Sequence, residues 1–185
     1  MVPPRLLASH ADRSGGSGLG RRDRRSGFDL HQGAPLCPWR QRGAKSQAIG
    51  VSRGGQTTKV HVITDVLGRP AVIHLTSGNA SDIKAAPEVI AAAPGRLRRL
   101  LADRGYDADA LRRDLRAAGT MPVIPGRRTR KRPIRHDNDR YRDRWRIEAA
   151  FCRLKDFRRI ATRYDKLAAN FASAVALATV VAFWC

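Results

Sequence analysis

The sequence is poor in cysteine, and this shortage narrows the class of protein. Its three cysteines, Cys37, Cys152 and Cys185, are odd in number and widely spaced, so they predict neither a disulfide framework nor a zinc site. No apolar run follows the basic residues near the start of the chain, and we expect no secretory signal. These absences favour a reducing compartment, the cytoplasm.

Acidic residues are also scarce, because 16 Asp and Glu face 36 Lys and Arg, for a formal net charge of +20. A charge so far from zero indicates a polyanionic partner, since binding an anion relieves the repulsion within the chain. Nucleic acid is the first candidate, and nothing indicates a small-molecule substrate. The alternative is a generally basic composition inherited from a GC-rich gene. At 185 residues the chain is expected to form one domain.

The longest apolar stretch, residues 167–185, is long enough to be considered as a membrane span. It is rich in alanine and is interrupted by Asn170, Ser173 and Thr179. We therefore expect a helix that is buried or covered by a partner, and no membrane association. A membrane-anchored protein is the alternative, which cell fractionation would separate.

Residues 1–43 differ in composition from the rest of the chain. Gly, Ser, Pro and Arg dominate, and no period of 2 or 3.6 residues is present. This composition predicts an irregular basic arm that is disordered or, as argued below, translated out of frame. The folded domain is expected to span residues 44–185.

From residue 44 onward, hydrophobic periodicity and turn residues predict an α/β domain. A hairpin comes first, with turn residues at 66–70, and Ser81 or Asp82 is expected to cap the helix that follows. Asp137 is a suitable N-cap for the long helix. The expected strands are 57–63, 71–75, 96–101 and 121–124, and the expected helices are 83–92, 107–118, 137–155 and 167–185.

Asp103 stands at the end of an apolar strand and is followed by Gly105. A carboxylate fixed at the tip of a sheet is a suitable metal ligand, because the strand holds it in place and the glycine lets backbone approach. Asp107 and Asp109 are instead assigned to the first turn of the next helix, where negative charge is favourable.

Residues 126–135 form a basic segment without aromatic residues, so we expect contact with phosphate rather than stacking on bases. The alternative is a solvated loop that touches nothing. The candidate phosphate ligands are Arg127, Arg128, Arg130, Lys131 and Arg132.

The long helix carries a polar stripe beside an apolar face. Tyr141, Arg144, Glu148 and Lys155 fall within an arc of roughly 60° at 100° per residue. An apolar face on the same helix docks it on a core, which holds the stripe at a surface or a cleft. On an arbitrary helix such a stripe is most often a solvated charged face.

The spacing Tyr-x2-Arg-x3-Glu-x6-Lys resembles the third catalytic segment of DDE transposases of bacterial insertion sequences. The text Asp-x-Gly-Tyr from Asp103 resembles their second catalytic segment, and Ser-Arg-Gly-Gly at 52–55 and FRRIATRYDKLAANF at 157–171 also look like that family. The resemblance covers residues 44 to 185.

This resemblance implies a ribonuclease-H-like fold, a mixed sheet with flanking helices, and strand cleavage and transfer by two-metal phosphoryl transfer. Asp103 and Glu148 would be catalytic residues that bind Mg²⁺ or Mn²⁺, Arg144 and Lys155 would contact DNA phosphate, and Tyr141 would position the strand. The partners implied are the element ends and target DNA in a bacterial nucleoid, with a homo-oligomer left open.

One part of the family pattern has no match. Members carry a first catalytic Asp in an Asp-Ser-Thr text on the central strand, upstream of the Ser-Arg-Gly-Gly loop, and no such text occurs here. Asp29 lies at about the right distance in the wrong context, and Asp65 is better explained as a turn residue. The first, central strand is therefore expected to be missing or replaced, in an N-terminally truncated or frameshifted copy.

The genetic code supplies a specific explanation. Codons for Gly27 to Leu30, read one base later, can encode Asp-Ser-Thr-Ser. We therefore expect residues 1 to about 42 to be out of frame and strand cleavage to be weak or absent. The alternative is a non-catalytic basic DNA-binding protein, in which Asp103 and Glu148 have no metal to bind.

Overall fold

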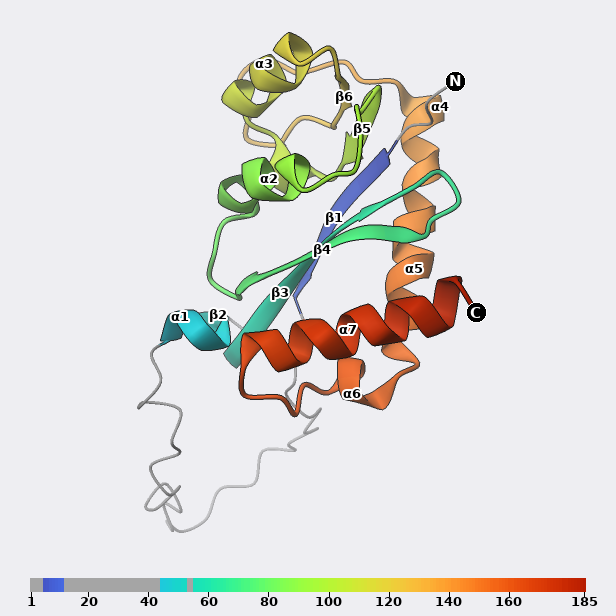
Figure 1. Cartoon of the computed structure of the whole chain (residues 1–185). Coiled ribbons are helices and arrows are strands. Elements are labelled where there is room, and N and C mark those ends of the chain that lie inside the picture. Colours follow the sequence, from blue (N-terminus) through green and yellow to red (C-terminus); the bar gives the residue numbers. More distant parts are fainter. Residues whose placement is uncertain (1–4, 12–43, 53–54) are drawn as a thin grey trace, which may run out of the picture.

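A mixed β-sheet organises the structure, a computed structural model that describes residues 5–11, 44–52 and 55–185 (Figure 1). The order of elements confirms the α/β pattern expected from the sequence. The elements are β1 (Arg5–Ala11), α1 (Ala44–Gln47), β2 (Gly50–Ser52), β3 (Gly55–Thr64), β4 (Pro70–Ser77), α2 (Asp82–Ala91), β5 (Arg99–Ala102), the 3-10 turn η2 (Arg104–Tyr106), α3 (Asp109–Ala117), β6 (Met121–Val123), α4 (Asn138–Tyr141), the 3-10 turn η3 (Arg142–Arg144), α5 (Trp145–Lys155), α6 (Arg158–Ala161) and α7 (Ala168–Phe183).

The predicted hairpin forms one side of the sheet. β3 pairs antiparallel with β4, and β2 pairs with the start of β3. The turn between β3 and β4 is held by Asp65, whose carboxylate accepts hydrogen bonds from the backbone N–H groups of Leu67 and Arg69 at 2.9 Å. The turn role expected for Asp65 is therefore confirmed.

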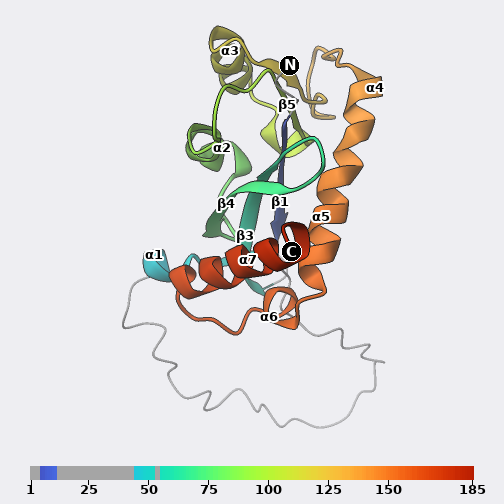
Figure 2. The ribbon, with the colours of Figure 1, turned by 45° about the vertical axis from the view of Figure 1, so that its right-hand side comes forward.

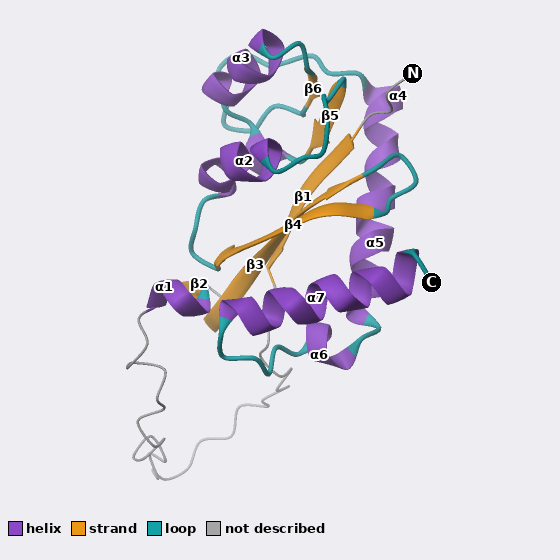
Figure 3. Ribbon diagram, viewed as in Figure 1, coloured by secondary structure: helices purple, strands orange, loops and turns teal. Residues whose placement is uncertain are grey.

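The central strand is present, and it comes from a segment that the sequence did not predict as a strand. β1 pairs antiparallel with β3 on one side and parallel with β5 on the other, and β6 continues the sheet beyond β5 (Figure 3). The expectation of an irregular arm is thus wrong for Arg5–Ala11, which form a strand at the centre of the sheet. The physical reason is that β3 and β5 would otherwise carry unpaired backbone groups. Asp29 and Cys37 lie outside the described residues.

The helices cover both faces of the sheet, and alternation along β3 divides the core between them. Ile63 packs in one cluster with α2, α3 and β5, whereas Val60 and Val62 pack in a second cluster with α5, α6 and α7. Figure 2 shows α2 on one side of the strands and α5 on the other. Phe171 on α7 is fully buried in the second cluster.

Several helix ends follow the predicted signals. Gly95 and Gly119 have φ values of 75° and 71° just after α2 and α3, a conformation that favours glycine. Asp137 caps α4 by accepting the N–H of Arg140. Ser81 occupies the N-cap position of α2, but no side-chain capping hydrogen bond forms there.

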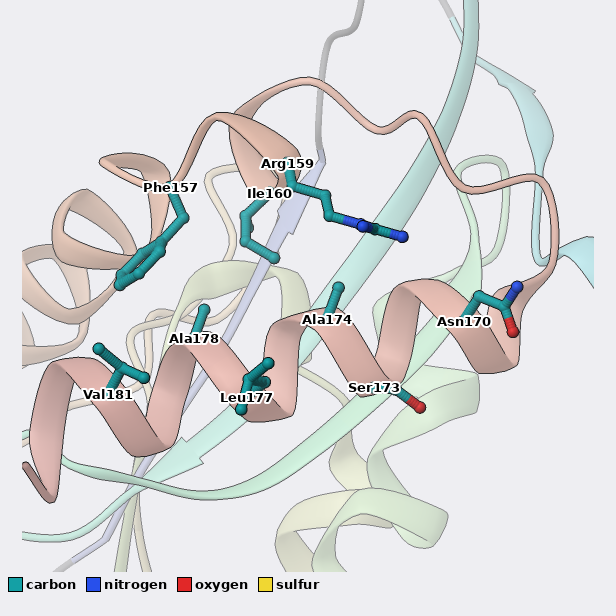
Figure 4. A pocket seen from close by; sticks show the side chains of 9 residues that line it. All are labelled: Phe157, Arg159, Ile160, Asn170, Ser173, Ala174, Leu177, Ala178 and Val181. Atoms are coloured by element: carbon teal, nitrogen blue, oxygen red, sulfur yellow. The ribbon is translucent and has the colours of Figure 1, made fainter.

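α7 is a surface helix of 16 residues. Among the described residues no helix is long and apolar enough to cross a membrane. A hollow of about 500 Å³ lies between α6 and α7, where Phe157 and Ile160 face Ala174 and Leu177 (Figure 4). The hollow has no acidic lining residue, so it offers no carboxylate to a metal.

Candidate active site and DNA-binding surface

Asp103 lies directly after β5, on the face of the sheet that α5 covers. Side chains alternate along a strand, so Asp103 shares its face with Leu101. Leu101 packs against Ile147 of α5, and Glu148 is the next residue of that helix. Packing of the helix on the strand therefore brings both candidate ligands to the same side of the molecule.

The carboxylate of Asp103 is half-buried, and its Oδ1 accepts the backbone N–H of Gly105 at 2.8 Å. Burial raises its pKa, and so does the nearby Asp82, while the Gly105 hydrogen bond and the positive charge of Arg144 act in the opposite direction. A cation placed near Asp103 would therefore stabilise the ionised form of its carboxylate.

Asp82 is a second carboxylate close to Asp103, which sequence reasoning had treated only as a helix cap. Its Oδ1 forms an ion pair with Lys59 Nζ at 3.0 Å. A Cβ atom at Gly105 would lie 2.7 Å from Asp82 Oδ2 and 2.9 Å from Asp103 Oδ1. A side chain at position 105 would therefore displace one or both of these carboxylates. No spacing rule in the sequence pairs residues so far apart.

Tyr141, Arg144 and Glu148 form a second group of side chains near Asp103. Glu148 is exposed, and one oxygen accepts a hydrogen bond from Arg144 Nη2. The guanidinium of Arg144 lies over the Tyr141 ring, 5.7 Å from its centre. Burial raises the pKa of Tyr141, Arg144 lowers it, and the negative charges of Asp103 and Glu148 raise it. Tyr141 is therefore within electrostatic reach of both carboxylates.

Lys155 does not join this group. It lies seven residues beyond Glu148, about 10 Å further along the helix axis at 1.5 Å per residue. There it borders a small apolar pocket with Val60 and Phe171. If Lys155 contacts DNA, it does so at a different point of the strand from Arg144.

The five predicted phosphate ligands of the loop after β6 fall into two groups. Arg127 and Arg130 are bonded to the protein itself. The other three are Arg128, Lys131 and Arg132, which are exposed, as Arg127 also is.

Asp107 is the centre of the bonds that hold this loop. Its side chain is fully buried and pairs with the buried Arg112 at 2.8 Å and with Arg130 at 2.6 Å. Oδ2 also accepts the backbone N–H of Arg127. Burial alone would raise the pKa of Asp107, but the hydrogen bonds from Arg130, Arg127 and Arg112 outweigh it and lower the pKa to about 2.

The assignment of Asp107 to the first turn of a helix is therefore wrong. α3 begins at Asp109, and Asp107 is an internal counter-ion for two arginines. Asp109 does occupy the first turn, as expected. Sequence reasoning missed the pairing of Asp107 with Arg130, because the partners are 23 residues apart.

The carboxylates of the described residues do not fit a site for two divalent metal ions. Among the described residues no three His, Cys, Asp or Glu side chains converge on one point. β1, which occupies the centre of the sheet, contains no acidic residue. Asp82 is paired with Lys59 and Glu148 with Arg144, so these carboxylates and Asp103 offer few free oxygen ligands for two dications.

The chain is an α/β protein whose candidate site combines the carboxylates of Asp103 and Glu148 with basic side chains. Comparison with known proteins identifies the family. The family described as "Transposase DDE domain" matches residues 26–183. The chain belongs to this family. β1 precedes the matching stretch.

Two relatives specify the branch of the family. The chain is 35% identical over 121 residues to a protein of Burkholderia cepacia named as a candidate transposase for the insertion sequence element IS402, a match of 60% of this chain and 55% of that protein. It is 36% identical over 126 residues to one of Brucella ovis named for the element IS6501, a match of 66% of this chain and 94% of that protein. The chain thus resembles transposases of insertion sequences, and spans about half the length of the Burkholderia relative. No solved structure matches significantly.

Proposed function

We propose that this chain is a degenerate transposase catalytic domain that binds DNA and has lost strand cleavage. The observation that supports the proposal is that Tyr141 is within electrostatic reach of both Asp103 and Glu148, with Arg144 close to both carboxylates. In intact members of the family, carboxylates at these positions would bind Mg²⁺ or Mn²⁺ for two-metal phosphoryl transfer. DNA of a bacterial nucleoid, with element ends and target, is the expected partner.

We also propose that the fold is ribonuclease-H-like. The supporting observation is the strand arrangement: an antiparallel hairpin, then a central strand that is antiparallel to β3 and parallel to β5. Helices then alternate with parallel strands, as the resemblance implies. Under this proposal residues 44–185 are the catalytic domain, and the origin of residues 1–43 in another reading frame is testable in the gene's nucleotide sequence.

The proposal of lost cleavage is supported by the shortage of carboxylates. β1 contributes none, and the oxygen of Glu148 that faces Arg144 is already in an ion pair. This pairing also favours the second candidate function, a basic DNA-binding protein in which Asp103 and Glu148 have only structural roles. Both candidates predict binding to DNA phosphate through the exposed cations of the loop.

Glu148→Gln tests whether this carboxylate still supports cleavage. DNA binding and Mg²⁺- or Mn²⁺-dependent nicking are measured on the same chain with duplexes that carry the element ends. We expect binding that weakens with salt by about 0.9 in log K per log salt for each phosphate contacted, equal or tighter binding by E148Q, and no nicking by either chain. Metal-dependent nicking that E148Q abolishes would contradict the loss of cleavage, and an absence of DNA binding would contradict both candidates.

A further inference from the structure

The backbone turn that carries Asp103 is held by a cation of the basic loop. Arg127 donates from Nη2 to the carbonyl oxygen of Gly105 at 2.9 Å and from Nε to that of Arg104 at 3.2 Å. Its own backbone N–H donates to Asp107 Oδ2 at 2.8 Å. Three bonds thus fix Arg127 on residues 104–107.

Gly105 is bonded at both its polar atoms. Its N–H donates to Asp103 Oδ1 at 2.8 Å, and its carbonyl accepts from Arg127. The peptide groups on either side of Gly105 therefore connect the guanidinium of Arg127 to the carboxylate of Asp103. Without Arg127, the carbonyl of Gly105 would lose this donor, and the orientation of Asp103 would become less fixed.

The cations of the loop differ in their bonding and not in their exposure alone. Arg127, Arg128 and Lys131 are all exposed, whereas Arg130 is half-buried and bonded to Asp107 and Asp109 at 2.6 Å. Arg127 and Arg130 are thus held on the protein, and Arg128 and Lys131 are exposed neighbours of these anchored arginines.

We propose that Arg127 is a positioning residue for Asp103, and that Arg128 and Lys131 rather than Arg127 bind DNA phosphate. The inference deepens the proposed function and rests on it for the role of DNA. A phosphate bound at Arg128 would restrain the adjacent Arg127, so DNA binding on the loop is coupled to the orientation of Asp103.

Adjacent arginines provide a matched test in the full chain. Arg127→Lys keeps the charge but lacks the planar guanidinium that donates from two nitrogens to the two carbonyl oxygens, and Arg127→Ala removes the charge as well. Arg128→Lys and Arg128→Ala are the corresponding controls. Amide hydrogen exchange of Gly105 reports on the turn, and affinity for a short DNA duplex across a range of salt concentrations reports on phosphate contacts.

We expect R127K and R127A to speed exchange of the Gly105 amide by about tenfold, the loss of one to two hydrogen bonds, and to leave the salt dependence of DNA binding unchanged. R128A should flatten the salt dependence by about 0.9 without affecting Gly105, and R128K should resemble the unmodified chain. Added DNA should slow Gly105 exchange in the unmodified chain but not in R127K.

The inference is overturned if Gly105 exchanges at the same rate in R127K, or if R127A flattens the salt dependence as much as R128A does. If the unmodified chain shows no affinity for DNA, the proposed function fails, while the exchange rates without DNA still decide whether Arg127 positions the turn. R127K, which preserves charge and the aliphatic stem, gives this answer even if R127A does not fold.

Discussion

Replacing Asp107 by asparagine tests the electrostatic centre of the loop. The two carboxylate oxygens accept hydrogen bonds from Arg112 at 2.8 and 3.0 Å, from Arg130 at 2.6 and 3.1 Å, and from the Arg127 backbone. Asparagine supplies one acceptor oxygen and turns an N–H group toward donors. It also removes the counter-charge of Arg112, whose side chain is only 4% exposed.

Breaking a buried ion pair from one side costs about 3–5 kcal/mol, because the remaining charge is left without a partner. We therefore expect Asp107→Asn to lower the free energy of unfolding by this amount at pH 7. Part of the effect depends on pH. The folded state lowers the pKa of Asp107 from 3.8 to about 2, so the stabilisation is fully present above about pH 4 and is lost as the pH falls toward 2.

At about 1.36 kcal/mol for each pH unit, this titration amounts to about 2 kcal/mol. Urea unfolding of both chains between pH 7 and pH 2 measures it, and the difference between them should narrow by about that amount. Asp109→Asn is the matched control, since Asp109 pairs with the same Arg130 but is 71% exposed, and it should change stability little. A stability of D107N equal to that of D109N at pH 7, or a difference that stays constant with pH, would refute the reasoning.

Two further substitutions test packing. At Gly78 an added Cβ would lie 2.7 Å from the Thr57 carbonyl oxygen. Gly78→Ala should therefore destabilise the hairpin by about 1–3 kcal/mol in urea unfolding. Gly126→Ala is the control and should not destabilise the chain, because a Cβ there would lie at ordinary van der Waals distances from its neighbours. Phe171→Ala should lower the free energy of unfolding by about 3–5 kcal/mol, because Phe171 is fully buried, and Tyr164→Ala, at a 65% exposed position, should have little effect. Equal losses of stability in Gly78→Ala and Gly126→Ala, or in Phe171→Ala and Tyr164→Ala, would contradict the packing described.

Local signals predicted much of the fold. The alternating run at 57–63 lies within β3, and the turn residues that follow it end at β4. Ile147, Ala150 and Leu154, spaced for one face of a helix, are the buried residues of α5. These features depend on residues within one or two turns of each other, where periodicity and turn chemistry determine the structure.

Long-range ionic contacts were not predictable in the same way. Composition indicated that the loop after β6 is basic, but not that Arg127 and Arg130 bond to residues 104–109 of the protein itself. These bonds depend on Asp107. In the sequence, α3 and β6 lie between Asp107 and the loop. The sequence does not distinguish a solvated charged residue from a paired one, because only the tertiary fold sets its distance to a counter-ion.

The central strand shows why the fold and the chemistry of this chain can separate. A sheet needs backbone N–H and C=O groups at its centre, and any extended segment supplies them. β1 does so in a register that pairs Leu7 with Ile63 on one side and with Ala102 on the other. Metal binding needs a particular side chain, and the residue of β1 after Leu7, toward the level of Asp103, is Ala8. β1 can therefore complete the hydrogen bonds of the sheet without adding a carboxylate next to Asp103.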